Sequence, residues 1–273
     1  MTSFATSGHV RLDVTLAGGE VTVDAVNATG SVEIELVPLR DNEATRQAIA
    51  EARVEMTDRG DAHEIVVEVQ KKSGFVIGRG VKVGVQIRCP EGSDLRLRSA
   101  AADLQATGAL GFVTAKTASG DISIDDASRL DVETASGDVR ARDLDGPFDG
   151  RTASGDIAIR RCFGPFEARL VSGDLSVGEA AAGLSVTTVS GDVRFDSAGG
   201  GAMRVQAVSG DVHLAIAPGE QLYIDASSVS GSMSSSLGVE DAPAEGGPVH
   251  EVRVRTVSGD LELVRAAGVR VQA

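Results

Sequence analysis

The 273-residue chain has no tryptophan, a single tyrosine and only 3% aromatic residues. Globular cores normally use aromatic side chains to fill irregular space, so this composition indicates a more regular core. The two cysteines, Cys89 and Cys162, are far apart and show no Cys-x-x-Cys spacing. We therefore predict neither a disulfide framework nor a zinc site, in agreement with a reducing compartment.

Long apolar runs and an excess of positive charge are also missing. No segment approaches the roughly 20 apolar residues that span a bilayer, and the first residues lack the basic and apolar stretches of a secretory signal. We expect a cytoplasmic chain without direct membrane insertion; any association with a membrane would be through a partner. Its 26 basic and 40 acidic residues give a formal charge of −14, which repels phosphate backbones. Nucleic acid is therefore not an expected partner.

What the chain has instead is glycine, 33 residues of it, and an internal repeat. A Ser-Gly-Asp triplet recurs with a period near 18 residues, the signature of stacked structural repeats. The triplets begin at Ser119, Ser136, Ser154, Ser172, Ser190, Ser209 and Ser258, with Ser-Gly-Ser at Ser230 and a degenerate Ala101-Ala102-Asp103 one period earlier.

Apolar residues form columns around the triplets, which predict two short strands in each repeat. The positions six and four before each serine are apolar or small, with a polar position between them, and this period of two is typical of a strand with one buried face. A further apolar column lies three residues after the serine. Another small or apolar column lies eight residues after it: Ala127, Leu144, Cys162, Ala180, Ala198 and Ala217.

These columns fit either side-by-side hairpins or a coil. The residue just before each serine is apolar too, which breaks strict alternation and favours a bend around a core, and hence a coil. We predict an all-β, right-handed parallel β-solenoid of about nine rungs over residues 96–273, with a surface loop inserted at 234–248.

The first 95 residues read as a β-rich N-terminal cap domain. Strand patterns occur at 10–14, 21–23, 32–36, 65–69 and 81–87, and a helix is expected at about 42–54 behind an Asn or Asp cap. Such a cap would protect the end of a solenoid from pairing with other chains. The Gly-rich segment 71–80 fits no phosphate-binding spacing and is expected to be a turn between strands.

The triplet aspartates raise two interpretations. In the first, glycine supplies unusual backbone angles while the Asp and Ser oxygens accept backbone N–H groups of the turn. In the second, the stacked carboxylates form a cation ladder, since neighbours about 4.8 Å apart would otherwise repel. The ladder would use Asp121, Asp138, Asp156, Asp174, Asp192 and Asp211. We favour the first interpretation and predict no metal site and no cofactor.

Catalysis has little support in the sequence. None of the repeated serines lies in a Gly-x-Ser-x-Gly elbow, and the four histidines are scattered. Glycan cleavage would need paired carboxylates and aromatic platforms, yet most phenylalanines fall in columns expected to be buried. Outward acids such as Asp131, Asp149 and Glu167 are more simply a solvated face. We predict no catalytic residues.

The repeated Thr-Ala-Ser-Gly-Asp and Thr-Val-Ser-Gly-Asp units, preceded by Ile87–Leu95, resemble the bacterial putative-adhesin β-strand-repeat family, a domain of unknown function. The resemblance implies a β-helical fold without catalytic residues and a link to cell-envelope stress. Our first hypothesis is a non-enzymatic module that presents its repetitive surface to an unknown protein partner. The alternatives are a cytoplasmic scaffold that polymerises through the solenoid ends as a homo-oligomer, and a glycan-binding or glycan-cleaving β-helix.

Overall fold

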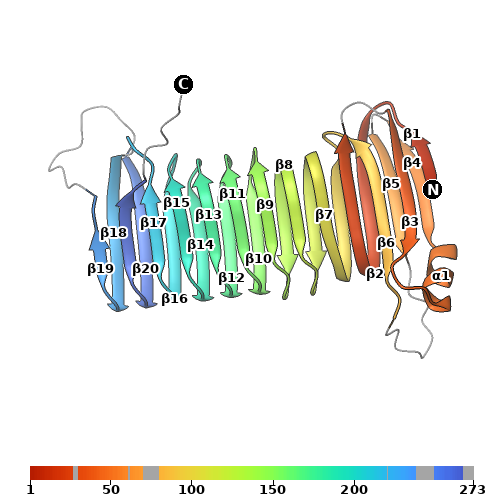
Figure 1. Cartoon of the computed structure of the whole chain (residues 1–273). Helices are drawn as coiled ribbons and strands as arrows, with labels where there is room; N and C mark the ends of the chain where they lie inside the picture. The colour runs from red at the N-terminus through yellow and green to blue at the C-terminus, as the bar shows by residue number, and fades with distance from the viewer. Residues whose placement is uncertain (27–29, 61, 70–79, 220, 238–248, 267–273) are drawn as a thin grey trace, which may run out of the picture. The chain divides into compact units, whose positions relative to one another are not determined.

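The computed structural model describes residues 1–26, 30–60, 62–69, 80–219, 221–237 and 249–266 (Figure 1). Most of the expected turn 71–80 and loop 234–248 lies outside these residues. The chain forms two compact units, Met1–Arg142 and Asp143–Ala273. Both are built almost entirely from β-strands, with one helix among the described residues.

Unit 1 contains β1 (Thr2–Ala5), β2 (His9–Val26), β3 (Ser31–Pro38), α1 (Glu43–Ala50), β4 (Arg53–Arg59), β5 (Ala62–Val69), β6 (Val83–Pro90), β7 (Asp94–Thr117) and β8 (Ile122–Thr134). The unit boundary falls within β9 (Val139–Leu144). Unit 2 contains β10 (Phe148–Ser154), β11 (Ile157–Cys162), β12 (Phe166–Ser172), β13 (Leu175–Ala180), β14 (Leu184–Ser190), β15 (Val193–Ala198), β16 (Met203–Ser209), β17 (Val212–Ile216), β18 (Gln221–Ser230), β19 (Met233–Ser235), β20 (Val249–Ser258) and β21 (Leu261–Arg265).

The strands of unit 2 stack in two parallel ladders. Strands β10, β12, β14 and β16 pair in register on one ladder, and β11, β13, β15 and β17 pair on the other. Phe166 faces Phe148 and Leu184, each 18 residues away, so the sequence period is the length of one coil, here called a rung. The predicted parallel β-solenoid is confirmed.

The core of unit 2 is filled by like residues stacked on like. The predicted inward columns are buried: Phe148, Phe166 and Val205 expose at most 2% of their surface. The rings of Phe148 and Phe166 stack with centroids 4.9 Å apart. Gly150 makes room for them, since a Cβ there would lie 2.5 Å from the Phe148 ring.

The last strands of the sequence are not the last strands of the stack. Strand β20 pairs with β16 on one side and with β18 on the other, and β21 lies likewise between β17 and β19. The rung containing Ser258 is therefore inserted between the rungs of Ser209 and Ser230. The sequence order of the triplets had suggested instead that the Ser258 rung comes last.

The N-terminal strand of unit 1 is inserted in the same way. Strand β2 pairs in parallel with β7 along one edge, and with β5 and then β6 along its other edge. Parallel stacking thus extends into the first 95 residues, where the expected β-rich cap contains rungs without a Ser-Gly-Asp triplet. The turn of β2 has Gly18-Gly19-Glu20 in its place, with Glu20 opposite Asp103.

Antiparallel strands and the helix close unit 1. Strand β3 pairs antiparallel with β6 and with β1, while β4 pairs antiparallel with β5. The helix begins where predicted, because the Asn42 side chain accepts a hydrogen bond from the Thr45 N–H at 2.7 Å. It ends at Ala50, earlier than expected, and its buried residue is Thr45.

Candidate interaction surface

The triplet aspartates form a ladder of hydrogen bonds from rung to rung. In unit 2, Oδ1 of Asp174 accepts the backbone N–H of Asp192 at 2.8 Å, and Asp192 accepts that of Asp211 at 2.8 Å. Unit 1 repeats the contact from Asp121 to Asp138 at 3.0 Å. The aspartates therefore accept N–H groups, as the favoured interpretation predicts, but those of the next rung rather than of their own turn.

The end of the ladder explains the irregular triplet. Asp211 accepts from Asp260, and Asp260 accepts from the N–H of Ser232, each at 2.8 Å. The hydrogen bonds from Ser232 lower the pKa of Asp260 below its usual value. Within the described part of the chain, Ser232 belongs to the last rung of the stack, and no residue described there places a further amide beyond it. Serine in place of aspartate at this position therefore marks the end of the stack.

Glycine at the middle of the triplet permits the close approach of the rungs. Gly191 has a φ of +127°, and a Cβ added to it would lie 2.1 Å from the carbonyl oxygen of Gly173. Both the backbone angle and the contact exclude larger residues.

The cation-ladder alternative remains a hypothesis. Five of the six ladder carboxylates (Asp121, Asp156, Asp174, Asp192 and Asp211) accept a backbone amide, and Asp138 bonds Arg140, which offsets part of the repulsion between neighbouring aspartates. Among the described residues, no group of three His, Cys, Asp or Glu side chains is placed to hold a metal ion.

The residue before each serine points outward, so it keeps the alternation that we expected it to break, although the coil inferred from it is confirmed. Val171, Val189, Val208 and Val257 expose 48–55% of their surface, and Val229 exposes 82%. These five residues occupy the same position on consecutive rungs of unit 2, and we call them the valine ladder. In unit 1 the same position holds the exposed Ala118 and Ala135.

The inward position is taken by the preceding residue, which is often threonine. Thr188 and Thr256 expose 2% and 4% of their surface, and their hydroxyls donate to the carbonyls of Ser190 and Ser258 at 3.4 Å. In unit 1, the Thr117 hydroxyl accepts from the N–H of Gly120 at 3.1 Å. At these three positions the buried hydroxyl bonds a backbone group of the turn, and the alternation of the strand places the next residue outside.

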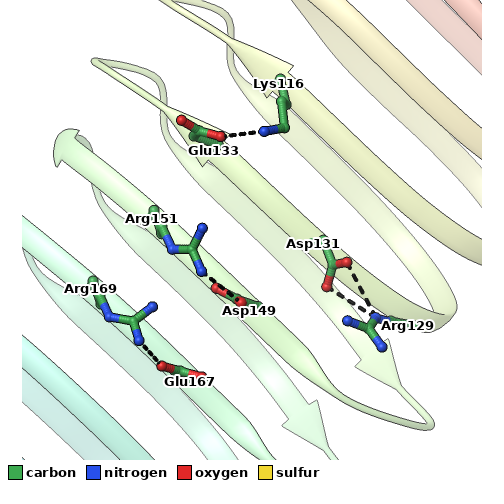
Figure 2. A network of polar contacts seen from close by, with 8 residues as sticks. All are labelled: Lys116, Arg129, Asp131, Glu133, Asp149, Arg151, Glu167 and Arg169. Carbon is green, nitrogen blue, oxygen red and sulfur yellow. Dashed lines mark hydrogen bonds and ion pairs between the residues drawn. The ribbon is translucent and has the colours of Figure 1, made fainter.

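The outward acids near the predicted solvated face pair with basic residues, as Figure 2 shows. Asp149 bonds Arg151 at 3.1 Å, and Glu167 bonds Arg169, in both cases within one strand of unit 2. In unit 1, Arg129 bonds Asp131 at 3.1 Å, and Lys116 bonds Glu133 on the neighbouring strand at 2.6 Å. These contacts give each acid a counter-charge. Such pairing suits a solvated structural surface better than the paired carboxylates of a glycan-cleaving site.

Unit 1 contains an open groove with an exposed aromatic residue. Phe112 exposes 60% of its surface and is one of the phenylalanines that lie outside the buried columns. The nearby Asp94 accepts the N–H of Phe112 at 2.8 Å and lies 2.8 Å from His9. The carboxylate is thus already engaged by two groups of the protein.

Two further features bear on chemistry. Cys89 and Cys162 are free and buried, and burial raises the pKa of each thiol to about 11, so that both stay protonated at neutral pH. No helix in the described part of the chain has the length and apolar character to cross a membrane.

Comparison with known proteins identifies relatives of the same fold. The family model described as Toastrack DUF4097 matches residues 51–264. A putative adhesin from Parabacteroides distasonis ATCC 8503 has a similar solved structure, with 11% identity, 96% of this chain and 95% of that chain covered, and a TM-score of 0.50. A putative adhesin from Bacteroides fragilis NCTC 9343 matches at 10% identity over 96% and 95% of the two chains, with a TM-score of 0.38. No curated protein matches the chain.

Proposed function

The chain belongs to the Toastrack DUF4097 family, and from that premise we propose that it is a non-enzymatic interaction module that binds a protein partner through the valine ladder of unit 2. The observation that carries the proposal is the row of exposed valines beside the triplets. On consecutive rungs a valine is exposed, while the residue before it is buried on four of the five rungs (Leu170, Thr188, Ala207 and Thr256), so a regular apolar stripe lies on the surface. Exposed apolar patches of this kind mark protein interaction sites.

The geometry of the ladder suits an extended partner. Neighbouring rungs are about 4.8 Å apart, so the five valines form a straight row. Each isopropyl group that a partner covers contributes roughly 1 kcal/mol or more, at about 25 cal/mol per Å² of buried apolar surface. The row as a whole can therefore support specific binding without a pocket.

The aspartate ladder sets the charge of the partner. Asp174, Asp192, Asp211 and Asp260 are exposed three residues after the valines of their rungs. Their remaining carboxylate oxygens place a row of negative charge beside the apolar row. We infer a partner segment with apolar residues flanked by lysine or arginine, because opposite charge favours association and like charge opposes it.

Site-specific photo-crosslinking tests the proposal. The crosslinking residue p-benzoylphenylalanine is placed at Val208 and, in a second variant, at Ser176, an exposed position on β13. After irradiation of cells that express each variant, we expect discrete protein adducts from position 208 and not from position 176. Adding Val189→Lys to the Val208 variant should abolish the adducts, because it places a charge within the apolar row.

Arg204→Ser is the matched control, since Arg204 is exposed on β16 but is not part of the valine ladder. It should leave the adducts unchanged. Identical adducts from positions 176 and 208, or adducts that persist with Val189→Lys, would refute the assignment of the valine ladder as the binding surface.

A further inference from the structure

We propose that the last rung of unit 2, formed by β18 and β19, is the interface for a second copy of this chain, and that two copies pair around a two-fold axis into a closed dimer. The rung has a free edge. Strand β18 pairs with β20 and β19 pairs with β21, and neither has a second strand partner among the described residues. The outer backbone groups of both strands can thus pair with another chain.

The core positions of this rung are open at the same edge. Ile224 and Met233 expose 38% and 55% of their surface. Their counterparts on the neighbouring rung, Val252 and Leu261, expose 0% and 2%. Tyr223, beside Ile224, exposes 65%. A further rung would cover Ile224 and Met233, as the Ser230 rung covers Val252 and Leu261.

The edge strand β18 lacks the residues that usually prevent an edge strand from pairing with another chain. Natural edge strands carry lysine, proline or inward charges that oppose pairing. Residues 221–237 contain no lysine, arginine or proline, and Asp225 is their single charge. Asp225 is engaged by Arg253 at 3.3 Å and by Arg255 at 3.8 Å on β20.

Charge favours a second copy as the occupant. The chain carries a formal charge of −14, so most of its surface repels another copy. The last rung is the exception, because Ser232 replaces the triplet aspartate and Asp225 is paired. Two such rungs can approach without bringing carboxylate ladders together. The exposed Tyr223, Ile224 and Met233 of one copy can then pack against the same residues of the other.

Assembly stops at two copies because a two-fold contact uses the same surface on both copies, and that surface is then occupied. A dimer with antiparallel β18 strands has this symmetry. End-to-end polymerisation would instead require a second, different surface that binds the last rung.

Sedimentation equilibrium of the full chain over a concentration series tests the proposal. We expect a monomer–dimer equilibrium that saturates at the dimer. Ile224→Lys should raise the dissociation constant by about tenfold or more, because it places a charge in the interface. Val189→Lys, on the valine ladder, should leave it unchanged. A monomer at all concentrations, growth beyond the dimer, or loss of the dimer with Val189→Lys alone would overturn the proposal.

Spin-label distances give an independent test that does not disturb the interface core. Ser234 and Ser176 lie in one column of unit 2, linked through Glu262, His213 and Arg194, and are four strand spacings apart. Four spacings are about 19 Å. In the proposed dimer, the distance between labels at Ser176→Cys should exceed that at Ser234→Cys by up to about 38 Å, twice the separation of the two positions along the stack. Similar distances for both labels would indicate side-by-side association and refute the two-fold end contact.

Discussion

The two ends of the parallel stacks are finished in different ways. At the end in unit 1, the chain reverses direction and lays antiparallel strands on β5 and β6. Strand β1, which pairs with β3, has four residues, and β4 carries Arg53 and Glu55, which bond each other at 2.7 Å. At the end in unit 2, β18 and β19 continue the parallel stack and stop. A solenoid can therefore close an end with short, charged strands or leave it as a nearly neutral rung.

The sharpest test of this difference compares one column inside the stack and at its end. Val205→Asp should destabilise the chain by more than about 4 kcal/mol, because the carboxylate would be buried without a partner. Ala226→Asp lies in the same column on the last rung and should cost the monomer less than about 1 kcal/mol, because water reaches this position in a single copy. Urea unfolding measures both.

Arg204→Ser serves as the surface control for that pair and should leave the unfolding midpoint unchanged. Equal losses for Val205→Asp and Ala226→Asp would show that the last rung is as buried as the interior.

The turns offer a second comparison of interior and end. Gly191→Ala should cost about 2–4 kcal/mol, because the new Cβ would collide with the Gly173 carbonyl and φ is positive. Gly60→Ala, near the end in unit 1, keeps the positive φ of +67° but meets nothing within 4 Å, so we expect about 1 kcal/mol. Thermal unfolding of the two variants separates the close contact from the backbone strain.

The aspartate ladder should matter inside the stack and not at its end. Asp174→Ala removes the acceptor for the Asp192 N–H and should cost about 1–2 kcal/mol, while Asp174→Asn keeps an acceptor oxygen and should recover most of it. Ser232→Asp adds a carboxylate beyond the last donor and should change stability by less than about 0.5 kcal/mol. A large gain from Ser232→Asp in urea unfolding would mean that a further amide lies above it.

The smallest expected effect concerns pH. Hydrogen bonds from Ser232 hold the pKa of Asp260 below its unfolded value, so this contact stabilises the last rung above that unfolded pKa and is lost as pH falls through the folded one. Exchange protection of the Ser232 amide, followed by NMR, should therefore decrease in acid. In Asp260→Asn, protection should no longer depend on pH in this range.

Much of the repeat could be predicted because its signal lies within a short stretch of sequence. The period of the triplet and the columns around it gave the parallel stack and most inward residues, including Phe166 and Val205. The position before the serine was assigned to the wrong side, because hydrophobicity alone ranks valine above threonine for burial. The hydroxyl of Thr188 has a backbone carbonyl to satisfy inside, which the column pattern does not show.

The order of the rungs could not be predicted in the same way. Pairing between β16 and β20 joins residues 49 apart, such as Met203 and Val252, and a local period says nothing about such contacts. Two signals in the sequence were consistent with it: the longer spacings that follow Ser209 and the replacement of aspartate by Ser232. Neither signal identifies the neighbour of β16 without the structure.

The inserted strands have a consequence for synthesis on the ribosome. Strand β2 leaves the ribosome before β5, β6 and β7, between which it finally lies, and β20 emerges only after β16 and β18. Rungs therefore cannot all be added in the order of translation, since β18 must wait for β20 or give way to it. A nascent chain that stalls before β20 would leave β16 and β18 free to pair wrongly, so correct assembly of unit 2 depends on completion of the chain.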